Sequence, residues 1–256
     1  MRKADMSVQG VIFDLGHTLM YLDSTWPAVF QHGVADLAAF VARQGLAVDG
    51  QAFARTLLDR RAEGFAQARQ TKREVTAEAS MRWTFSHFGL ADPGAALVTG
   101  AIDAFFAYEE DRWLAFPEAL PVLRELARRG LRLGMFSNAT HDPFIQNLVD
   151  RLGFRPWLNP ALSSAGTGIR KPDPAAFAPI LAAWGLPPEP VVVVGDTLDA
   201  DILGAQRAGM RSVWVHSREN ARQEGDETDQ SVPATSIMPD AAIEHLDELL
   251  ACLERL

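Results

Sequence analysis

The spacing of apolar residues divides the chain into a short strand, a helical stretch and an alternating region. An apolar run at residues 11–13 meets Asp14, and the pattern then breaks at Gly16 and His17. A short apolar run bounded by a turn signal is typical of a buried parallel strand. Over roughly the next hundred residues apolar positions recur every three or four residues, which predicts amphipathic helices.

Four helices are predicted in this stretch, with no strand between them. Thr25 and Asp49 are the predicted N-caps of the first two helices. The fourth is predicted to open at Asp92, directly before Pro93. Four amphipathic helices after a single strand predict a helical bundle inserted into the chain at that point.

From about residue 117 onward, helix and strand patterns alternate. Strands are predicted at residues 131–136, 191–194 and 213–215, with a weaker one within 158–163. Alternation at this spacing predicts an α/β fold with a parallel, doubly wound sheet. Residues 217–235 are polar and predict a loop, and an amphipathic helix is predicted to close the chain at residues 241–253.

Composition narrows the possible partners. The 256 residues carry a formal net charge of -9 with a pI near 5.1, so no overall positive field exists to hold nucleic acid or an anionic membrane. No apolar run approaches the length of about 20 residues that spans a bilayer, and no signal-peptide pattern is present. The single cysteine, Cys252, excludes an intrachain disulfide. These features predict a cytoplasmic protein.

Polar residues suited to chemistry stand at or near the ends of the predicted strands. In chain order they are Asp14, Ser137, Asn138, Lys171, Asp196 and Asp201. Taken singly, each has an ordinary explanation as a capping or loop residue. In open α/β sheets, however, ligands bind beyond the carboxyl ends of the strands, so these residues are expected to converge on one site.

This order of residues resembles the haloacid dehalogenase-like hydrolase superfamily, in its helical-cap form. The resemblance runs from about Val8 to Val215, and the four-helix insertion corresponds to the cap of that family. It implies a Rossmann-like core domain made of residues 1–22 and 115–256. It also implies a cap domain made of residues 23–114.

The resemblance implies roles for the strand-end residues. As metal ligands for Mg²⁺ it gives Asp14, the backbone carbonyl of Gly16 and Asp196, with Asp201 acting through water. As catalytic groups it gives the nucleophile Asp14 and the cation Lys171, and as substrate-binding groups Ser137, Asn138 and Lys171. The chemistry agrees, because phosphoryl transfer needs positioning and positive charge, and Mg²⁺ prefers oxygen ligands.

The chain departs from the family at one position. The usual motif is Asp-x-Asp-Gly-Thr, and its second Asp protonates the leaving group, but here that position is Gly16 and the next residue is His17. General acid–base catalysis contributes about 10²–10⁴-fold, so its loss predicts weakened turnover rather than none. His17, with an ordinary pKa near neutrality, is our candidate for a replacement acid.

These features predict a Mg²⁺-dependent phosphohydrolase that acts on a small phosphorylated metabolite through an aspartyl-phosphate intermediate. Three alternatives remain open. One is a non-catalytic protein that binds a phosphorylated ligand or a partner. Another is a dehalogenase, although that chemistry needs no acidic pair such as Asp196 and Asp201. A phosphonatase would need a Schiff-base lysine in the cap, where Lys72 is the only lysine.

Overall fold

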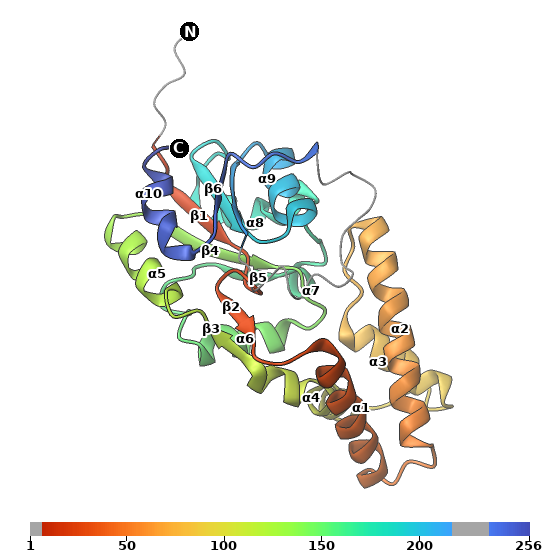
Figure 1. Ribbon diagram of the computed structural model, residues 1–256. Helices are drawn as coiled ribbons and strands as arrows, with labels where there is room; N and C mark the ends of the chain where they lie inside the picture. The colour runs from red at the N-terminus through yellow and green to blue at the C-terminus, as the bar shows by residue number, and fades with distance from the viewer. Residues whose placement is uncertain (1–6, 217–235) are drawn as a thin grey trace.

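The computed structural model describes residues 7–216 and 236–256 and has a six-stranded parallel sheet at its centre (Figure 1). The strands lie in the order β5-β4-β1-β6-β7-β8. Their bounds are β1 Gly10–Phe13, β4 Arg132–Ser137, β5 Ala161–Ser163, β6 Val191–Gly195, β7 Arg211–Val215 and β8 Ala241–Ile243. The predicted doubly wound α/β fold is confirmed.

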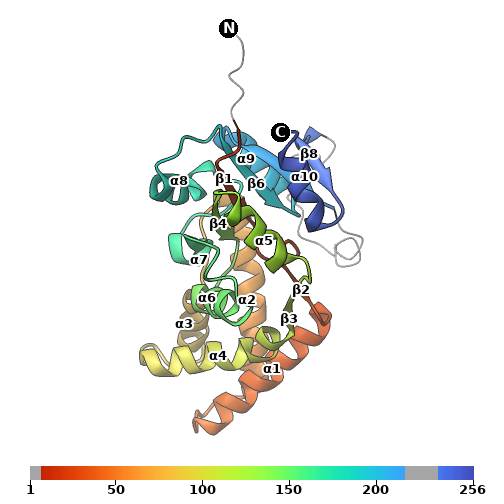
Figure 2. The ribbon, with the colours of Figure 1, turned by 90° about the vertical axis from the view of Figure 1, so that its left-hand side faces the viewer.

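Both faces of this sheet are buried, as its runs of β-branched residues predict. Val11 and Val192 point into one apolar core, whereas Ile12 and Val193 point into the other, because successive side chains of a strand alternate between faces. Helices cover both faces (Figure 2). Those on the first face include α5 (Ala119–Arg128), α6 (Asp142–Arg151) and α10 (Leu249–Leu253), and those on the second are α8 (Ala178–Trp184) and α9 (Leu203–Ala208).

Short helical turns complete the core. They are α7 (Ser164–Thr167), two 3₁₀ turns at Pro174–Ala176 and Leu246–Glu248, and a π-helical turn at Leu198–Ile202. Between β1 and β4 stand α1 (Trp26–Arg43), α2 (Gly50–Thr71), α3 (Ala77–His87) and α4 (Ala95–Arg112). In the described part of the chain, none of the helices combines the length and the apolar character needed to cross a membrane.

The four helices α1–α4 gather at one end of the sheet, below it in Figure 1. Thr25 and Asp49 cap α1 and α2 as predicted, with Asp49 accepting from the amide of Gln51 at 2.8 Å. The fourth helix begins later than predicted, at Ala95, because Gly94 takes the N-cap position instead of Asp92.

The predicted closing helix at residues 241–253 is wrong in its first half. Residues 241–243 form the edge strand β8, and Ala242 pairs with Trp214 of β7. A helix begins only after His245, whose side chain forms a capping box with Glu248. Pairing with a distant strand therefore overrides the local helical pattern. The predicted loop at residues 217–235 lies outside the described residues.

A two-stranded antiparallel ladder joins the helices to the sheet and was absent from the prediction. It consists of β2 (Met20–Leu22) and β3 (Trp113–Ala115), with Leu22 opposite Trp113. The two points where the chain passes between the sheet and α1–α4 are thus hydrogen-bonded to each other. The predicted domain boundaries, after residues 22 and 114, fall at this ladder.

Candidate active site

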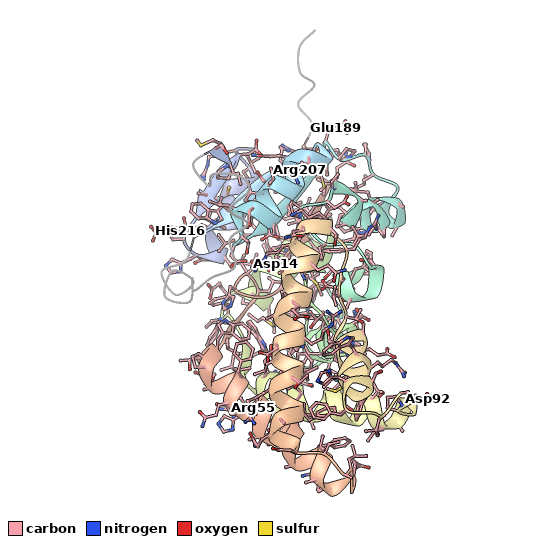
Figure 3. The ribbon with its side chains drawn as sticks, turned by 90° about the vertical axis from the view of Figure 1, so that its right-hand side faces the viewer. Asp14, Arg55, Asp92, Glu189, Arg207 and His216 are labelled. Carbon is pink, nitrogen blue, oxygen red and sulfur yellow. The ribbon has the colours of Figure 1, made fainter. Side chains whose placement is uncertain are left out.

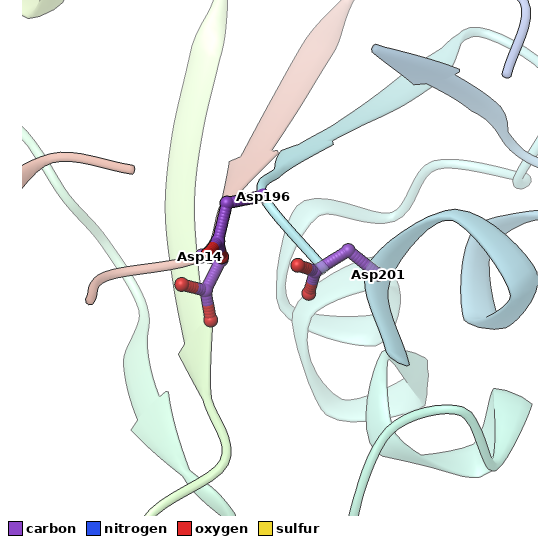
Figure 4. Close-up of side chains that lie close together, drawn as sticks. All are labelled: Asp14, Asp196 and Asp201. Carbon is purple, nitrogen blue, oxygen red and sulfur yellow. The ribbon is translucent and has the colours of Figure 1, made fainter. Parts of the chain in front are cut away.

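Three carboxylates meet at the carboxyl end of the sheet, and one of them, Asp14, lies at the level where the sheet adjoins α1–α4 (Figure 3). Asp14 follows β1, Asp196 follows β6, and Asp201 lies on the helical turn after β6 (Figure 4). One oxygen from each carboxylate lies within 4.8 Å of the others. This convergence follows from the parallel pairing of β1 with β6, which brings their carboxyl ends side by side.

Lys171 inserts its ammonium group between two of these carboxylates. Its Nζ lies 2.6 Å from Asp14 Oδ1 and 2.6 Å from Asp201 Oδ1, and it donates to the carbonyl of Phe136 at 2.8 Å. Asn138 holds the lysine in place, since its Oδ1 accepts from the Lys171 amide at 2.9 Å and its Nδ2 donates to the Lys171 carbonyl at 3.0 Å. The amide of Asn138 therefore contacts the lysine backbone rather than facing outward as a substrate contact would.

Ser137, the last residue of β4, lies at the same edge of the sheet. Its side chain is almost buried, and its hydroxyl has no hydrogen-bond partner within residues 7–216 and 236–256. A hydroxyl in this state can donate to an oxygen of a bound anion.

The charges of the site are unbalanced. Burial raises the pKa of Asp14 to about 7, against the lowering effect of Lys171 and with a further rise caused by Asp201. Burial, with the neighbouring Asp14 and Asp201, also raises the pKa of Asp196 well above its usual value. Burial opposes the positive charge of Lys171, but the two carboxylates outweigh it and raise the pKa of the lysine. When all three carboxyls are ionised, they leave an excess of two negative charges over the one ammonium, which a divalent cation would neutralise.

Two hydrogen bonds from Thr197 and the absence of a side chain at Gly195 orient the acidic pair, Asp196 and Asp201. The amide of Thr197 donates to Asp201 Oδ2 at 3.0 Å, and its hydroxyl donates to Asp196 Oδ1 at 3.3 Å. Gly195 makes room for this arrangement, because a Cβ atom there would stand 2.3 Å from the Cγ atom of Asp201. Only a glycine allows so close an approach.

The site differs from the usual family pattern around Gly16. A Cβ atom at this position would lie 3.5 Å from the Cη2 atom of Trp113, an ordinary contact, so space for a side chain exists. The ring of His17 lies 5.3 Å from the ring of Trp113. Burial lowers the pKa of His17 to about 4, so its imidazole is neutral at pH 7. The imidazolium form that would donate a proton to a leaving group is therefore not populated at this pH.

Several site residues were not found from the sequence. Trp113 borders Gly16 and His17, and its Nε1 donates to the buried carboxyl of Glu109 at 3.2 Å. The four-residue separation of Glu109 and Trp113 along the chain was an available signal, because residues at that spacing meet on a helix. The Phe136 carbonyl, which accepts from Lys171, could not be found from the sequence, since every residue has a backbone carbonyl.

Comparison with known proteins identifies the family. The profile of the haloacid dehalogenase-like hydrolases matches residues 8–209. The chain is 32% identical over 251 residues to the ribulose-1,5-bisphosphate 5-phosphatase of Halopiger xanaduensis, covering 93% of this chain and 96% of that protein. It is 41% identical over 113 residues to the phosphoserine phosphatase of Thermus thermophilus, of which it spans only 45%.

A solved structure shows the same relationship. The 2-haloacid dehalogenase of Pseudomonas syringae pv. tomato DC3000 is similar with a TM-score of 0.67 and 28% identity, covering 97% of this chain and 99% of that one. The profile match and the full-length relatives agree with the arrangement of carboxylates and lysine at the strand ends. The chain therefore belongs to the haloacid dehalogenase-like hydrolase family.

Proposed function

We propose that this protein is a Mg²⁺-dependent phosphohydrolase that removes the phosphoryl group of a small phosphorylated metabolite. The observation that carries the proposal is the convergence of Asp14, Asp196 and Asp201 within 4.8 Å, with the Lys171 Nζ 2.6 Å from Asp14. The phosphatase names of the two relatives above support it.

The three carboxylates fit Mg²⁺ in kind and in charge. Hard oxygen donors are the ligands that this ion prefers, and its two positive charges equal the excess negative charge of the site once all three carboxyls are ionised. Asp14, Asp196 and Asp201 would hold the ion, with the backbone carbonyl of Gly16 as a further ligand. When bound, the ion supplies positive charge to the oxygens of the transferring phosphoryl group.

Asp14 acts as the nucleophile. One oxygen of its carboxylate bonds to phosphorus while the bond from phosphorus to the leaving oxygen breaks, and an aspartyl-phosphate results. Water then attacks the phosphorus, releases inorganic phosphate and regenerates the carboxylate. Lys171 holds a fixed positive charge beside the attacking oxygen, and the Ser137 hydroxyl donates to a phosphoryl oxygen.

Gly16 shapes the leaving-group preference of this reaction. No side chain at that position protonates the departing oxygen, and His17 is neutral at pH 7 because burial lowers its pKa to about 4. Since general acid–base catalysis is worth about 10²–10⁴-fold, esters with poor leaving groups are affected most. Aryl phosphates, whose leaving oxygen needs no proton, are affected least.

The test is hydrolysis of para-nitrophenyl phosphate and of a panel of phosphorylated metabolites, with Mg²⁺ or with EDTA. We expect turnover that needs Mg²⁺ and that Asp14→Asn abolishes. Asp150→Asn is the matched control, because Asp150 forms only an exposed ion pair with Arg155. Turnover that survives Asp14→Asn, or the absence of any turnover, would contradict the proposal, and binding of a phosphorylated metabolite without turnover would favour the non-catalytic alternative.

Dehalogenation is the second candidate, favoured by the similarity to the Pseudomonas dehalogenase structure. In that reaction Asp14 would attack carbon and displace a halide, with no need for a metal. The excess negative charge contributed by Asp196 and Asp201 would then repel a carboxylate-bearing substrate. Release of chloride from 2-chloropropionate in EDTA tests this candidate, and we expect none.

A further inference from the structure

The loop between α2 and α3 binds two core segments that flank the active site. We call residues 72–77, which are this loop and the first residue of α3, the cap loop. Its Glu74 amide donates to the Gly168 carbonyl at 3.1 Å, and its Lys72 carbonyl accepts from the Arg170 amide at 3.0 Å. On the other side, the amide of Ala77 donates to the Thr140 carbonyl at 2.7 Å. The cap loop is therefore hydrogen-bonded to the segment before Lys171 and to the segment after Asn138.

Glu74 joins these two segments through its side chain. Its carboxylate is fully buried and lies 2.7 Å from Nη1 of Arg170, whose side chain is 10% exposed. The same carboxylate oxygen accepts from the hydroxyl of Ser164. Ser164 Oγ in turn accepts from the amide of Ala139 at 2.9 Å. One buried carboxylate thus contacts the neighbour of Lys171 directly and the neighbour of Asn138 through a single serine.

These contacts close a ring with the active site. Asn138 bonds the backbone of Lys171 at both its amide and its carbonyl, as described above. The ring runs from Glu74 through Arg170 to Lys171, then through Asn138 and Ala139 to Ser164 and back. Separating a buried ion pair is strongly destabilising, because it leaves a buried charge without a partner. The ring is therefore stable only while the cap loop stays in place.

Resting on the phosphohydrolase function proposed above, we propose that Glu74 is a positioning residue that couples the seating of the cap loop to the placement of Lys171. The side chain of Glu74 contacts Arg170 and Ser164, and within residues 7–216 and 236–256 it has no ion pair or hydrogen bond with Asp14, Asp196 or Asp201. Its effect passes through Arg170 and Ser164 to the two segments that carry Lys171 and Asn138. The cap helices and the catalytic lysine are then ordered together.

The test compares Glu74→Gln with Glu78→Gln, kinetically and by hydrogen exchange. Glu78 is a matched control, because it forms an exposed ion pair with Arg82 on α3 at 2.8 Å. We expect Glu74→Gln to lower kcat/KM for para-nitrophenyl phosphate by about tenfold or more, and Glu78→Gln to change it by less than about twofold. The amides of residues 168–171 should exchange faster in Glu74→Gln alone.

A double-mutant cycle separates positioning from general loss of stability. Arg170→Gln should give a loss similar to that of Glu74→Gln, and the double variant should be no worse than either one, because both remove one interaction. A double variant whose loss of kcat/KM equals the product of the two single losses would overturn the proposal. A Glu74→Gln variant with a lower Tm but unchanged kinetics and hydrogen exchange would also overturn it. Ser164→Ala, which keeps the ion pair, should give a smaller effect in the same direction. If the wild-type protein shows no turnover, the proposed function fails, while exchange at residues 168–171 still decides the role of Glu74.

Discussion

The Nζ atom of Lys171 lies 2.6 Å from Oδ1 of Asp14, and the lysine side chain is only 2% exposed. This contact joins residues that are 157 positions apart in the chain. It places a permanent positive charge against the oxygen proposed to attack phosphorus, so the nucleophile and its counter-charge are assembled before any substrate arrives.

Replacing this lysine should separate catalysis from metal binding. We expect Lys171→Met to lower kcat for para-nitrophenyl phosphate by about 10²–10³-fold, because fixed charge at the developing transition state is lost. Mg²⁺ should bind more tightly, since one cation no longer competes for Asp14 and Asp201. Steady-state kinetics and calorimetric titration with Mg²⁺ measure the two effects. Weaker binding of Mg²⁺ would show that the lysine orders the carboxylates instead of competing with the ion.

Metal-free protein should become less stable as the pH rises from about 4 to about 7. The pKa of Asp14 is about 7 when folded, against 3.8 as its ordinary value, so in this window the folded state binds more protons than the unfolded state. The free energy of unfolding therefore falls with rising pH, by on the order of a few kcal/mol across the window. Urea unfolding in EDTA at pH 5 and pH 8 measures the change.

Two additions control that experiment. Saturating Mg²⁺ should restore stability at pH 8, because it binds the ionised carboxylates of the folded state only. Asp14→Asn, which has no proton to lose at this position, should reduce the pH dependence in EDTA and leave the part that comes from Asp196. A metal-free protein whose stability does not change between pH 5 and pH 8 would mean that Asp14 ionises in this environment as easily as in water.

Gly16→Asp should restore an acid to the leaving group. The backbone there is outside the left-handed region, and a Cβ atom would make an ordinary 3.5 Å contact with Trp113, so the variant should fold. We expect kcat for alkyl phosphates to rise by about 10²-fold, and kcat for aryl phosphates to change little. A series of esters with graded leaving-group pKa measures this effect, because a plot of log kcat against that pKa should have a shallower slope in the variant. An unchanged slope would mean that another group already donates the proton.

His17→Ala tests the candidate for that other group. Because burial lowers the pKa of His17 to about 4, we expect turnover of alkyl phosphates at pH 7 to stay within a few-fold of wild type. A loss approaching a hundredfold, confined to poor leaving groups, would instead identify His17 as the acid and would require its pKa to rise when substrate binds.

Gly195→Ala should weaken metal binding without unfolding the sheet. The added Cβ atom would stand 2.3 Å from the Cγ atom of Asp201, so that carboxylate must move away from Asp14 and Asp196. We expect the affinity for Mg²⁺ to fall by about tenfold or more, as calorimetric titration would show. Gly94→Ala, where a Cβ atom would meet nothing within 4 Å, is the control. Equal affinities in the two variants would exclude Asp201 from the metal site.

Much of this architecture could be predicted from the sequence, because it depends on local pattern. Strands such as Val191–Gly195 combine β-branched residues with a glycine end, and parallel pairing then brings Asp14 and Asp196 together. Long amphipathic helices were equally readable, since many residues repeat the same spacing. Residues at strand ends were therefore identified before their neighbours in space were known.

What could not be predicted depends on tertiary partners. The ladder of β2 and β3 has strands of three residues each, too short to show a period. The edge strand at residues 241–243 contains two alanines and forms only because β7 lies beside it. Glu74 and Arg170 are 96 positions apart, and no local pattern links a loop carboxylate to that arginine.

The ladder of β2 and β3 has one more consequence. Because Leu22 and Trp113 are paired, the two connections to α1–α4 are joined to each other, so any movement of these helices relative to the sheet would bend both connections together. Trp113 belongs to this junction and also borders Gly16, so its side chain forms a wall beside the proposed position of the departing group. Opening for product release would then tilt this wall, and the rate of opening would respond to substitutions at Trp113 more than to substitutions on the outer helices.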